Sequence, residues 1–194
     1  MNNLRLMSLV GMIVGITLTP GLAAEKPLVD NRLTGFSPLP AFIYNPRNAV
    51  NNPKIRLGRM LYFDPRLCAD HKLSCNSCHN LDNYGADVGK VSIGFKGQAG
   101  SRNFPTVYNA AGHLAQFWDG RAIDVEAQAK GPMMNPVEMA MTPEERVIAT
   151  MQSMPEYFQL FQKAFPNDPN PVTFDNLVEC FTRFEHYQGP CAHG

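Results

Sequence analysis

Three residues constrain this chain more than any others, namely Cys75, Cys78 and His79 in the string Cys75-Asn76-Ser77-Cys78-His79. Two thiols at this spacing can add to the two vinyl groups of a haem while the adjacent imidazole reaches the iron from one face. A zinc site would need a second pair of ligands at a suitable spacing, and the sequence offers none. Because the string occurs once, we predict one covalently bound haem c with His79 on its iron.

Residues 1–24 have the composition of a secretory signal peptide. Arg5 is their only charge, an apolar run covers residues 9–18, and the segment ends in small residues at Ala23 and Ala24. A membrane anchor would need about 20 consecutive apolar residues, which this run does not reach. We therefore expect a periplasmic protein with no membrane span in its mature chain.

An exported chain lies in an oxidising compartment, where cysteines usually form disulfides. Outside the haem motif the cysteines are Cys68, Cys180 and Cys191. Cys180 and Cys191 could pair, since both lie near the C-terminus, and Cys68 would then be free. Sequence does not fix connectivity, so the pairing of these three residues stays open.

The apolar pattern after the signal peptide is helical, with no convincing strand, so we predict an all-α fold. Residues 25–53 hold five prolines and form an extended arm with a short turn near Asn48, a helical domain covers 54–187, and 188–194 is a tail. Glycines mark residues 81–104 as a long functional loop. We expect helices from Lys54 to Tyr62, Ser74 to Asn80, Thr106 to Leu114, Asp124 to Lys130 with an end at Gly131-Pro132, Thr142 to Met151, Pro155 to Phe165 and Phe174 to Tyr187.

The residue on the second face of the iron is not evident. Electron-carrying c-type cytochromes usually have Met or His there. A Met on a helix or loop is otherwise a core-filling residue, and His71 is too close in sequence to the haem motif to reach the opposite face easily. The sixth position therefore stays open among His71, His113, Met133, Met134, Met139 and Met141.

Several longer strings support a family resemblance because they occur together and in order. They are LGRMLYFDPRL at 57–67, SCNSCHN at 74–80, GQAGSRNFPTVYNAA at 97–111, AQFWDGRA at 115–122 and EAQAKGPMMNPVEMAM at 126–141. Together they closely resemble the bacterial dihaem cytochrome c peroxidases, the group that also contains the methylamine-utilisation maturation enzymes. The resemblance covers about residues 40 to 185 and implies a class I cytochrome c-like domain of the N-terminal, peroxide-reacting type.

The same resemblance implies roles for four further residues. Glu138 corresponds to the acid/base of the distal pocket and Gln128 to the polar group that guides peroxide. Trp118 is similar to the tryptophan between the two haems of the family, which implies a part in electron transfer. Asn103 is similar to the side-chain calcium ligand between the domains, so calcium is an implied second cofactor.

Two departures from the family pattern matter. Switching relatives place a histidine after Ser-Ile-Gly, which caps the peroxidatic iron at rest, whereas Phe95 follows Ser92-Ile93-Gly94 here. Phenylalanine cannot bind iron, so we expect high-spin ferric iron without reductive activation.

The family also continues into a second haem domain, and Cys191-Ala192-His193 is not its attachment motif. We therefore expect a truncated or frameshifted gene product of reduced activity.

The resulting hypothesis is an enzyme that reduces hydrogen peroxide to water with electrons from a small periplasmic redox protein, such as a cytochrome c or a cupredoxin. The alternative is a mono-haem c-type electron carrier without catalysis, and a third reading is a decayed fragment. Lysine and arginine number 17, as do aspartate and glutamate, so a nucleic-acid partner is not expected. We expect a monomer or a weak homodimer.

Overall fold

The computed structural model describes residues 35–37, 39–40, 43–49 and 51–186. The predicted signal peptide, the 188–194 tail and Cys191 lie outside the described residues. The chain divides into two compact units, Met1–Pro38 and Leu39–Gly194. The described helices all belong to the second unit.

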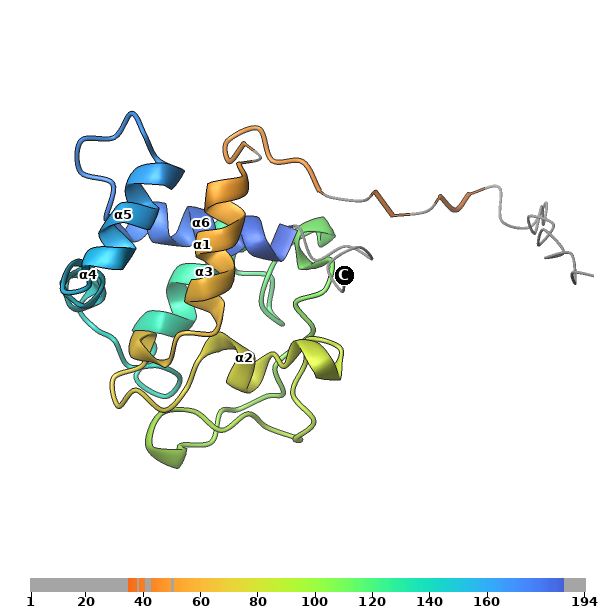
Figure 1. Cartoon of the computed structure of the whole chain (residues 1–194). Coiled ribbons are helices and arrows are strands. Elements are labelled where there is room, and N and C mark those ends of the chain that lie inside the picture. The colour runs from red at the N-terminus through yellow and green to blue at the C-terminus, as the bar shows by residue number, and fades with distance from the viewer. Residues whose placement is uncertain (1–34, 38, 41–42, 50, 187–194) are drawn as a thin grey trace, which may run out of the picture. The chain divides into compact units, whose positions relative to one another are not determined.

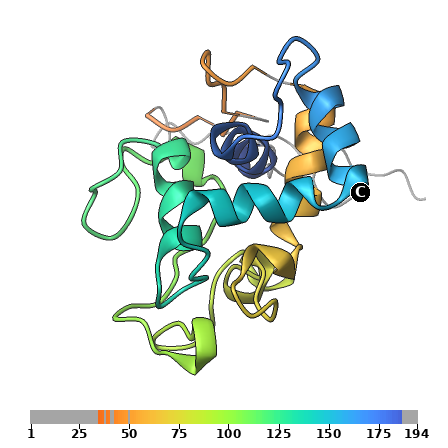
Figure 2. The same cartoon turned by 90° about the vertical axis from the view of Figure 1, so that its left-hand side faces the viewer.

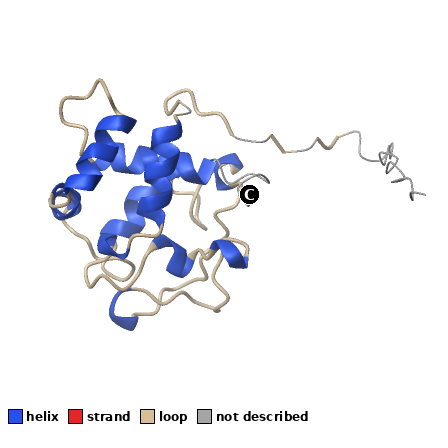
Figure 3. Ribbon diagram, viewed as in Figure 1, coloured by secondary structure: helices blue, strands red, loops and turns tan. Residues whose placement is uncertain are grey.

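Helices and loops make up the described part of the second unit, which contains no strand (Figure 3). The prediction of an all-α fold is confirmed. The α-helices are α1 (Asn52–Tyr62), α2 (Cys75–Cys78), α3 (Val125–Met134), α4 (Glu144–Gln152), α5 (Pro155–Ala164) and α6 (Phe174–His186). Short 3-10 turns are η2 (Pro65–Leu67), η3 (Leu81–Asn83), η4 (Phe95–Gly97) and η5 (Ala110–Gly112).

The centre of the unit is the packing of α1 against α6 (Figure 1). α1 begins after Asn51, whose side chain accepts a hydrogen bond from the Lys54 amide and so caps the helix. A Cβ atom at Gly58 would lie 1.9 Å from the carbonyl oxygen of Cys180, so only glycine allows the two backbones to approach this closely. Leu57 and Leu61 flank this contact and are fully buried.

α6 is the helix on which α1, α3 and α4 pack. Figure 2 looks along α6 and shows α1, α3 and α4 arranged around it. Its Leu177 and Val178 are buried together with Phe161 of α5 and Val147 of α4. The apolar stripe predicted for the last helix is therefore the main support of the core.

Two helix predictions are wrong by more than two residues. Residues 106–114 are mostly an irregular turn with only η5 in helical form, because Thr106 bonds the Tyr84 carbonyl and Asn109 adopts a positive φ of 57°. α3 does not end at Gly131-Pro132 but runs on to Met134. Its last carbonyls are satisfied by the chain that folds back, since the amides of residues 135, 139 and 141 bond the carbonyls of residues 131, 132 and 133.

Candidate haem site

The seven residues predicted from sequence to act on or hold a cofactor all line one cavity of about 610 Å³. They are Cys75, Cys78, His79, Asn103, Trp118, Gln128 and Glu138. They come from α2, the loops before and after η5, α3 and the segment that follows α3. The volume lies within the range of roughly 300–1,000 Å³ typical of cofactor sites.

The imidazole of His79 is held in the orientation that an iron ligand needs. Its Nδ1 lies 3.0 Å from the carbonyl oxygen of Pro105, so Nδ1 donates and the lone pair of Nε2 is left for a metal. The Phe104 ring packs on the imidazole with ring centres 5.1 Å apart. Burial lowers the pKa of His79, which keeps the ring in the neutral form that binds iron.

The backbone around the motif is fixed from both sides. The Tyr62 hydroxyl of α1 donates to the carbonyl oxygen of His79. Ser74 and Ser77 form a capping box that starts α2.

Burial raises the pKa of Cys75, and it raises that of Cys78 to about 11. Both thiols therefore keep their proton at neutral pH, which is the form that adds across a vinyl double bond. The donor set and the cavity fit a covalently attached haem.

Glu138 is positioned by its own turn and by a close backbone contact. The Asn135 side-chain amide nitrogen donates to Glu138 Oε1 at 2.7 Å. The backbone amide of Phe95 donates to the carbonyls of Val137 and Glu138 at 3.0 and 2.8 Å. A Cβ atom at Gly94 would lie 2.0 Å from the Val137 carbonyl oxygen, so glycine is required there.

Burial raises the pKa of the Glu138 carboxyl, while the Asn135 bond and the charge of Arg121 act in the opposite direction. A carboxyl with a raised pKa holds its proton to higher pH than an exposed carboxyl does, which suits a group that must both accept and release a proton. The sequence interpretation missed the two residues that hold it, Asn135 and Gly94. The Asn-Pro pair at 135 and 136 was the available indication of a turn.

Phe95 lies next to the cavity but does not line it. Among the described residues its neighbour Gly94 lines the cavity and Phe95 does not. The Phe95 ring packs on the hydrophobic core, and the Lys96 ammonium lies 5.1 Å from its centre. Of the six sixth-ligand candidates in the sequence, only Met133 and Met139 line the cavity.

The loop side of the cavity is held by hydrogen bonds between side chains and backbone. Trp118, 61 % exposed, donates from Nε1 to the Asn103 carbonyl at 2.9 Å. The Asn103 side chain donates to the carbonyls of Asp87 and Gly89 at 3.0 and 2.7 Å. The described residues include no group of three or more His, Cys, Asp or Glu that could hold a metal ion. The calcium role of Asn103 stays a prediction.

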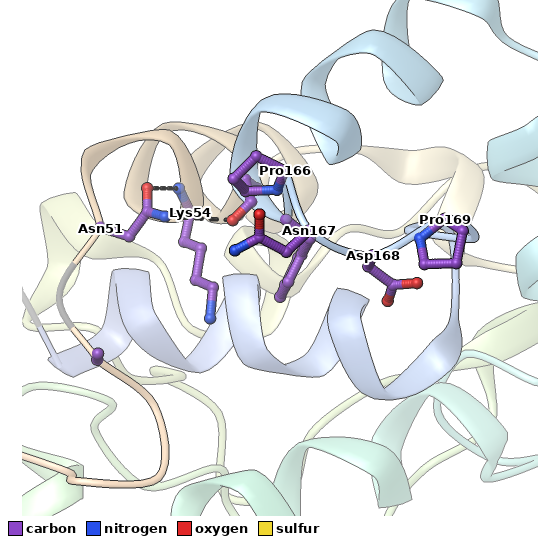
Figure 4. A pocket seen from close by; sticks show the side chains of 9 residues that line it. Asn51, Lys54, Pro166, Asn167, Asp168 and Pro169 are labelled. Atoms are coloured by element: carbon purple, nitrogen blue, oxygen red, sulfur yellow. Dashed lines mark hydrogen bonds between the residues drawn. The ribbon is translucent and has the colours of Figure 1, made fainter.

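A second cavity of about 540 Å³ lies between the start of α1 and the loop after α5 (Figure 4). Its main polar side chains already have partners. Lys54 pairs with Glu179 at 2.7 Å, Asn51 bonds the Ala164 carbonyl, and Asp168 accepts from Asn176. The larger cavity is therefore the better candidate for chemistry.

Sequence reasoning also missed Phe181 and Glu185, which line the larger cavity from α6. The apolar stripe of α6 was interpreted as core alone. The four-residue spacing of Phe181 and Glu185 places both on one face of the helix, and this was the pattern that could have indicated their position.

Comparison with known proteins gives one consistent result. The family model for di-haem cytochrome c peroxidase matches residues 52–189. The chain is 46 % identical over 165 residues to the cytochrome c551 peroxidase of Pseudomonas aeruginosa, covering 84 % of this chain and 47 % of that protein. It is 50 % identical over 137 residues to the cytochrome c551 peroxidase of Nitrosomonas europaea, covering 70 % and 40 %.

Comparison with solved structures supports the same type of fold. A MauG-like protein associated with microbial copper homeostasis superposes with a TM-score of 0.72 at 27 % identity, over 77 % of this chain and 44 % of that one. The prediction of a cytochrome c-like all-α fold is confirmed. The chain spans about half or less of the length of these two cytochrome c551 peroxidases. Within the described ranges, no helix is both long and apolar enough to cross a membrane.

Proposed function

The chain belongs to the di-haem cytochrome c peroxidase family, and we propose that it binds one haem c and reduces hydrogen peroxide to water. Cys75 and Cys78 would form the two thioethers, and His79 Nε2 would bind the iron. The observation that carries the proposal is that His79 and Glu138 line the same cavity. The bound haem would supply the iron that accepts peroxide and passes electrons to it.

The overall reaction takes one hydrogen peroxide, two electrons and two protons to two waters. Glu138 would take the proton from one peroxide oxygen and return it to the other, which leaves as water. Its raised pKa supports this role, because the carboxyl must both accept and release a proton. Asn135 holds the Glu138 carboxyl in place through the 2.7 Å bond to Oε1.

Gln128 and Trp118 would have supporting roles. The Gln128 amide, on the cavity face of α3, would donate to peroxide and orient it. Trp118 would carry electrons into the site, since its indole is 61 % exposed while it also lines the cavity. A small periplasmic redox protein, a cytochrome c or a cupredoxin, would supply those electrons after export of the chain.

The test is Glu138→Gln in the haem-loaded protein. The amide keeps the shape and cannot shuttle a proton, so the single-turnover rate with peroxide should fall by roughly 10²–10⁴. Haem content and the ferric spectrum should not change. Glu145→Gln, at an exposed position of α4, is the matched control and should react like the wild type. A wild-type rate in Glu138→Gln would rule out Glu138 as the group that transfers the proton.

A mono-haem electron carrier is the second candidate, and one observation favours it. Met133 and Met139 both line the cavity, and a Met ligand is typical of electron-carrying cytochromes. The ferric spectrum separates the two functions. High-spin iron supports the peroxidase, whereas low-spin iron with a Met-to-iron charge-transfer band supports the carrier.

A further inference from the structure

One carboxyl of the haem cavity has no part in the proposed peroxide reduction. Glu185 follows Phe181 by four residues on α6, and both line the cavity. Glu185 is 5 % exposed. No described residue donates a hydrogen bond to it. A carboxylate enclosed in a cavity is poorly solvated, so its charge should respond strongly to whatever charge the cavity holds.

The titratable groups that interact electrostatically with Glu185 come from three other helices. They are Tyr62 of α1, Cys75 of α2 and Glu126 of α3. Tyr62 and Cys75 are neutral at physiological pH, because burial raises the pKa of both. Neither supplies a positive charge to balance a carboxylate.

Glu126 is a negative neighbour. Burial acts to raise its pKa, but the His186 side chain, whose Nε2 lies 3.4 Å from Glu126 Oε1, and the Asn45 amide outweigh burial and lower that pKa to about 2. Glu126 is therefore ionised at neutral pH. Burial, followed by the charge of Glu126, raises the pKa of Glu185 to about 8 in the protein without its cofactor.

We propose that Glu185 is a redox-linked proton site of the haem, a carboxylate while the iron is ferric and a carboxylic acid once the iron is reduced. One electron passes from the donor protein to the iron, and one proton passes from solvent to a carboxyl oxygen of Glu185. The inference rests on the haem binding assumed in the proposed function, and not on the peroxide chemistry.

The physical reason is the change of charge at the iron. A ferric haem core carries one net positive charge, which stabilises a nearby carboxylate, and the ferrous core carries none. The interaction is large because a buried pair is poorly screened by water. The Glu185 carboxyl therefore has a lower pKa in the ferric than in the ferrous protein, and reduction is coupled to proton uptake between these two values.

The test is a spectroelectrochemical titration of the haem-loaded chain between about pH 5 and pH 9, a range that brackets the ordinary carboxyl pKa and the raised value. In the wild type, the equilibrium constant for reduction should fall as pH rises. Between the ferric and ferrous pKa values of Glu185, the fall should approach a factor of ten per pH unit. In Glu185→Gln this dependence should disappear. At the alkaline end its midpoint potential should lie above that of the wild type, because a negative charge next to the haem is lost.

Three variants make the result specific. Glu185→Asp should restore a pH-dependent potential. Glu179→Gln removes a carboxylate from the same helix, where Glu179 pairs with Lys54, and should leave the wild-type slope. If the slope persists in Glu185→Gln, or disappears in Glu138→Gln instead, the proposal is wrong. Because potentials are measured without peroxide, a failed peroxidase assay leaves this outcome readable.

Discussion

The helices and the long loop of this domain are held together by different forces. α1, α4, α5 and α6 pack apolar side chains into a core, with Phe161 and Leu177 fully buried. The loop between α2 and α3 instead uses polar side chains that bond backbone carbonyls. Thr106 bonds the Tyr84 carbonyl at 2.6 Å, and Tyr108 bonds the Leu81 carbonyl at 2.5 Å.

The difference has an energetic consequence. Burying a large apolar side chain stabilises a fold by about 1.5–3 kcal/mol, whereas a hydrogen bond contributes a net of about 0.5–1.5 kcal/mol. The loop carries much of the cavity wall, including Asn103, Phe104 and Trp118. The helical core should therefore remain folded without haem, while the loop should depend on the haem for its order.

The largest effect should come from removing the haem attachment. Cys75→Ala with Cys78→Ala should abolish covalent haem completely, so haem stain should vanish from denaturing gels. By amide hydrogen exchange, protection should fall in residues 81–124 and should persist in α1, α5 and α6. If covalent haem survived, the attachment site would be elsewhere. If α6 lost protection as fully as the loop, the proposed difference between the helical core and the loop would be wrong.

The next effect tests the helical core directly. Phe161 is fully buried, so Phe161→Ala should lower the free energy of unfolding by about 3–5 kcal/mol. Its ring lies outside the haem cavity, so the haem spectrum should not change. Phe158→Ala is the matched control on the same helix. Phe158 is 42 % exposed, and this change should cost much less in denaturant unfolding.

A buried polar contact in the helical part should have an intermediate effect. The Tyr157 hydroxyl donates to the Asp64 carboxylate at 2.5 Å, and Asp64 is 4 % exposed. Tyr157→Phe should cost about 1.5–3 kcal/mol at neutral pH, the range for hydrogen bonds to charged groups. Tyr84→Phe, at a ring 81 % exposed, should change the free energy of unfolding very little.

The pH dependence of that effect has a definite sign. Burial acts to raise the pKa of Asp64, but hydrogen bonds from Arg66 and Tyr157 outweigh it and lower the pKa. A lowered pKa in the folded state stabilises the protein above the unfolded carboxyl pKa of about 3.9. That contribution is lost as pH falls through the folded value. The cost of Tyr157→Phe should therefore shrink below about pH 4, and an equal cost in acid and at neutral pH would contradict this account.

The helical part was largely predictable from sequence, and the loop was not. α5 and α6 follow from apolar periodicity and begin at Pro155 and Phe174 as predicted. The predicted helix at 106–114 failed because local apolar spacing says nothing about the bonds that Thr106 makes to residue 84. The haem motif and the family resemblance predicted seven site residues, and the structure places all seven on one cavity. Gly94 and Glu185 were missed, because their positions depend on contacts far along the chain.

The smallest effect should be confined to the loop, and Asn103 tests it. Its amide nitrogen bonds the carbonyls of Asp87 and Gly89, so Asn103→Ala removes two hydrogen bonds and should lower the local opening free energy of residues 87–103 by about 0.5–1.5 kcal/mol per bond. Amide exchange in that segment measures this, and the free energy of global unfolding should not change.

Asn103→Asp separates this structural role from the predicted calcium role. A carboxylate keeps an oxygen at the same place but cannot donate to the two carbonyls, so the structural role predicts that Asp loosens residues 87–103 as Ala does. A calcium ligand behaves differently, because oxygen atoms are what calcium binds and an added negative charge strengthens the site. If millimolar calcium restores protection in Asn103→Asp but not in Asn103→Ala, then Asn103 is a ligand as well as a support. If calcium changes neither variant nor the wild type, the loop is held by hydrogen bonds alone, in contrast to the apolar packing that holds the helical core.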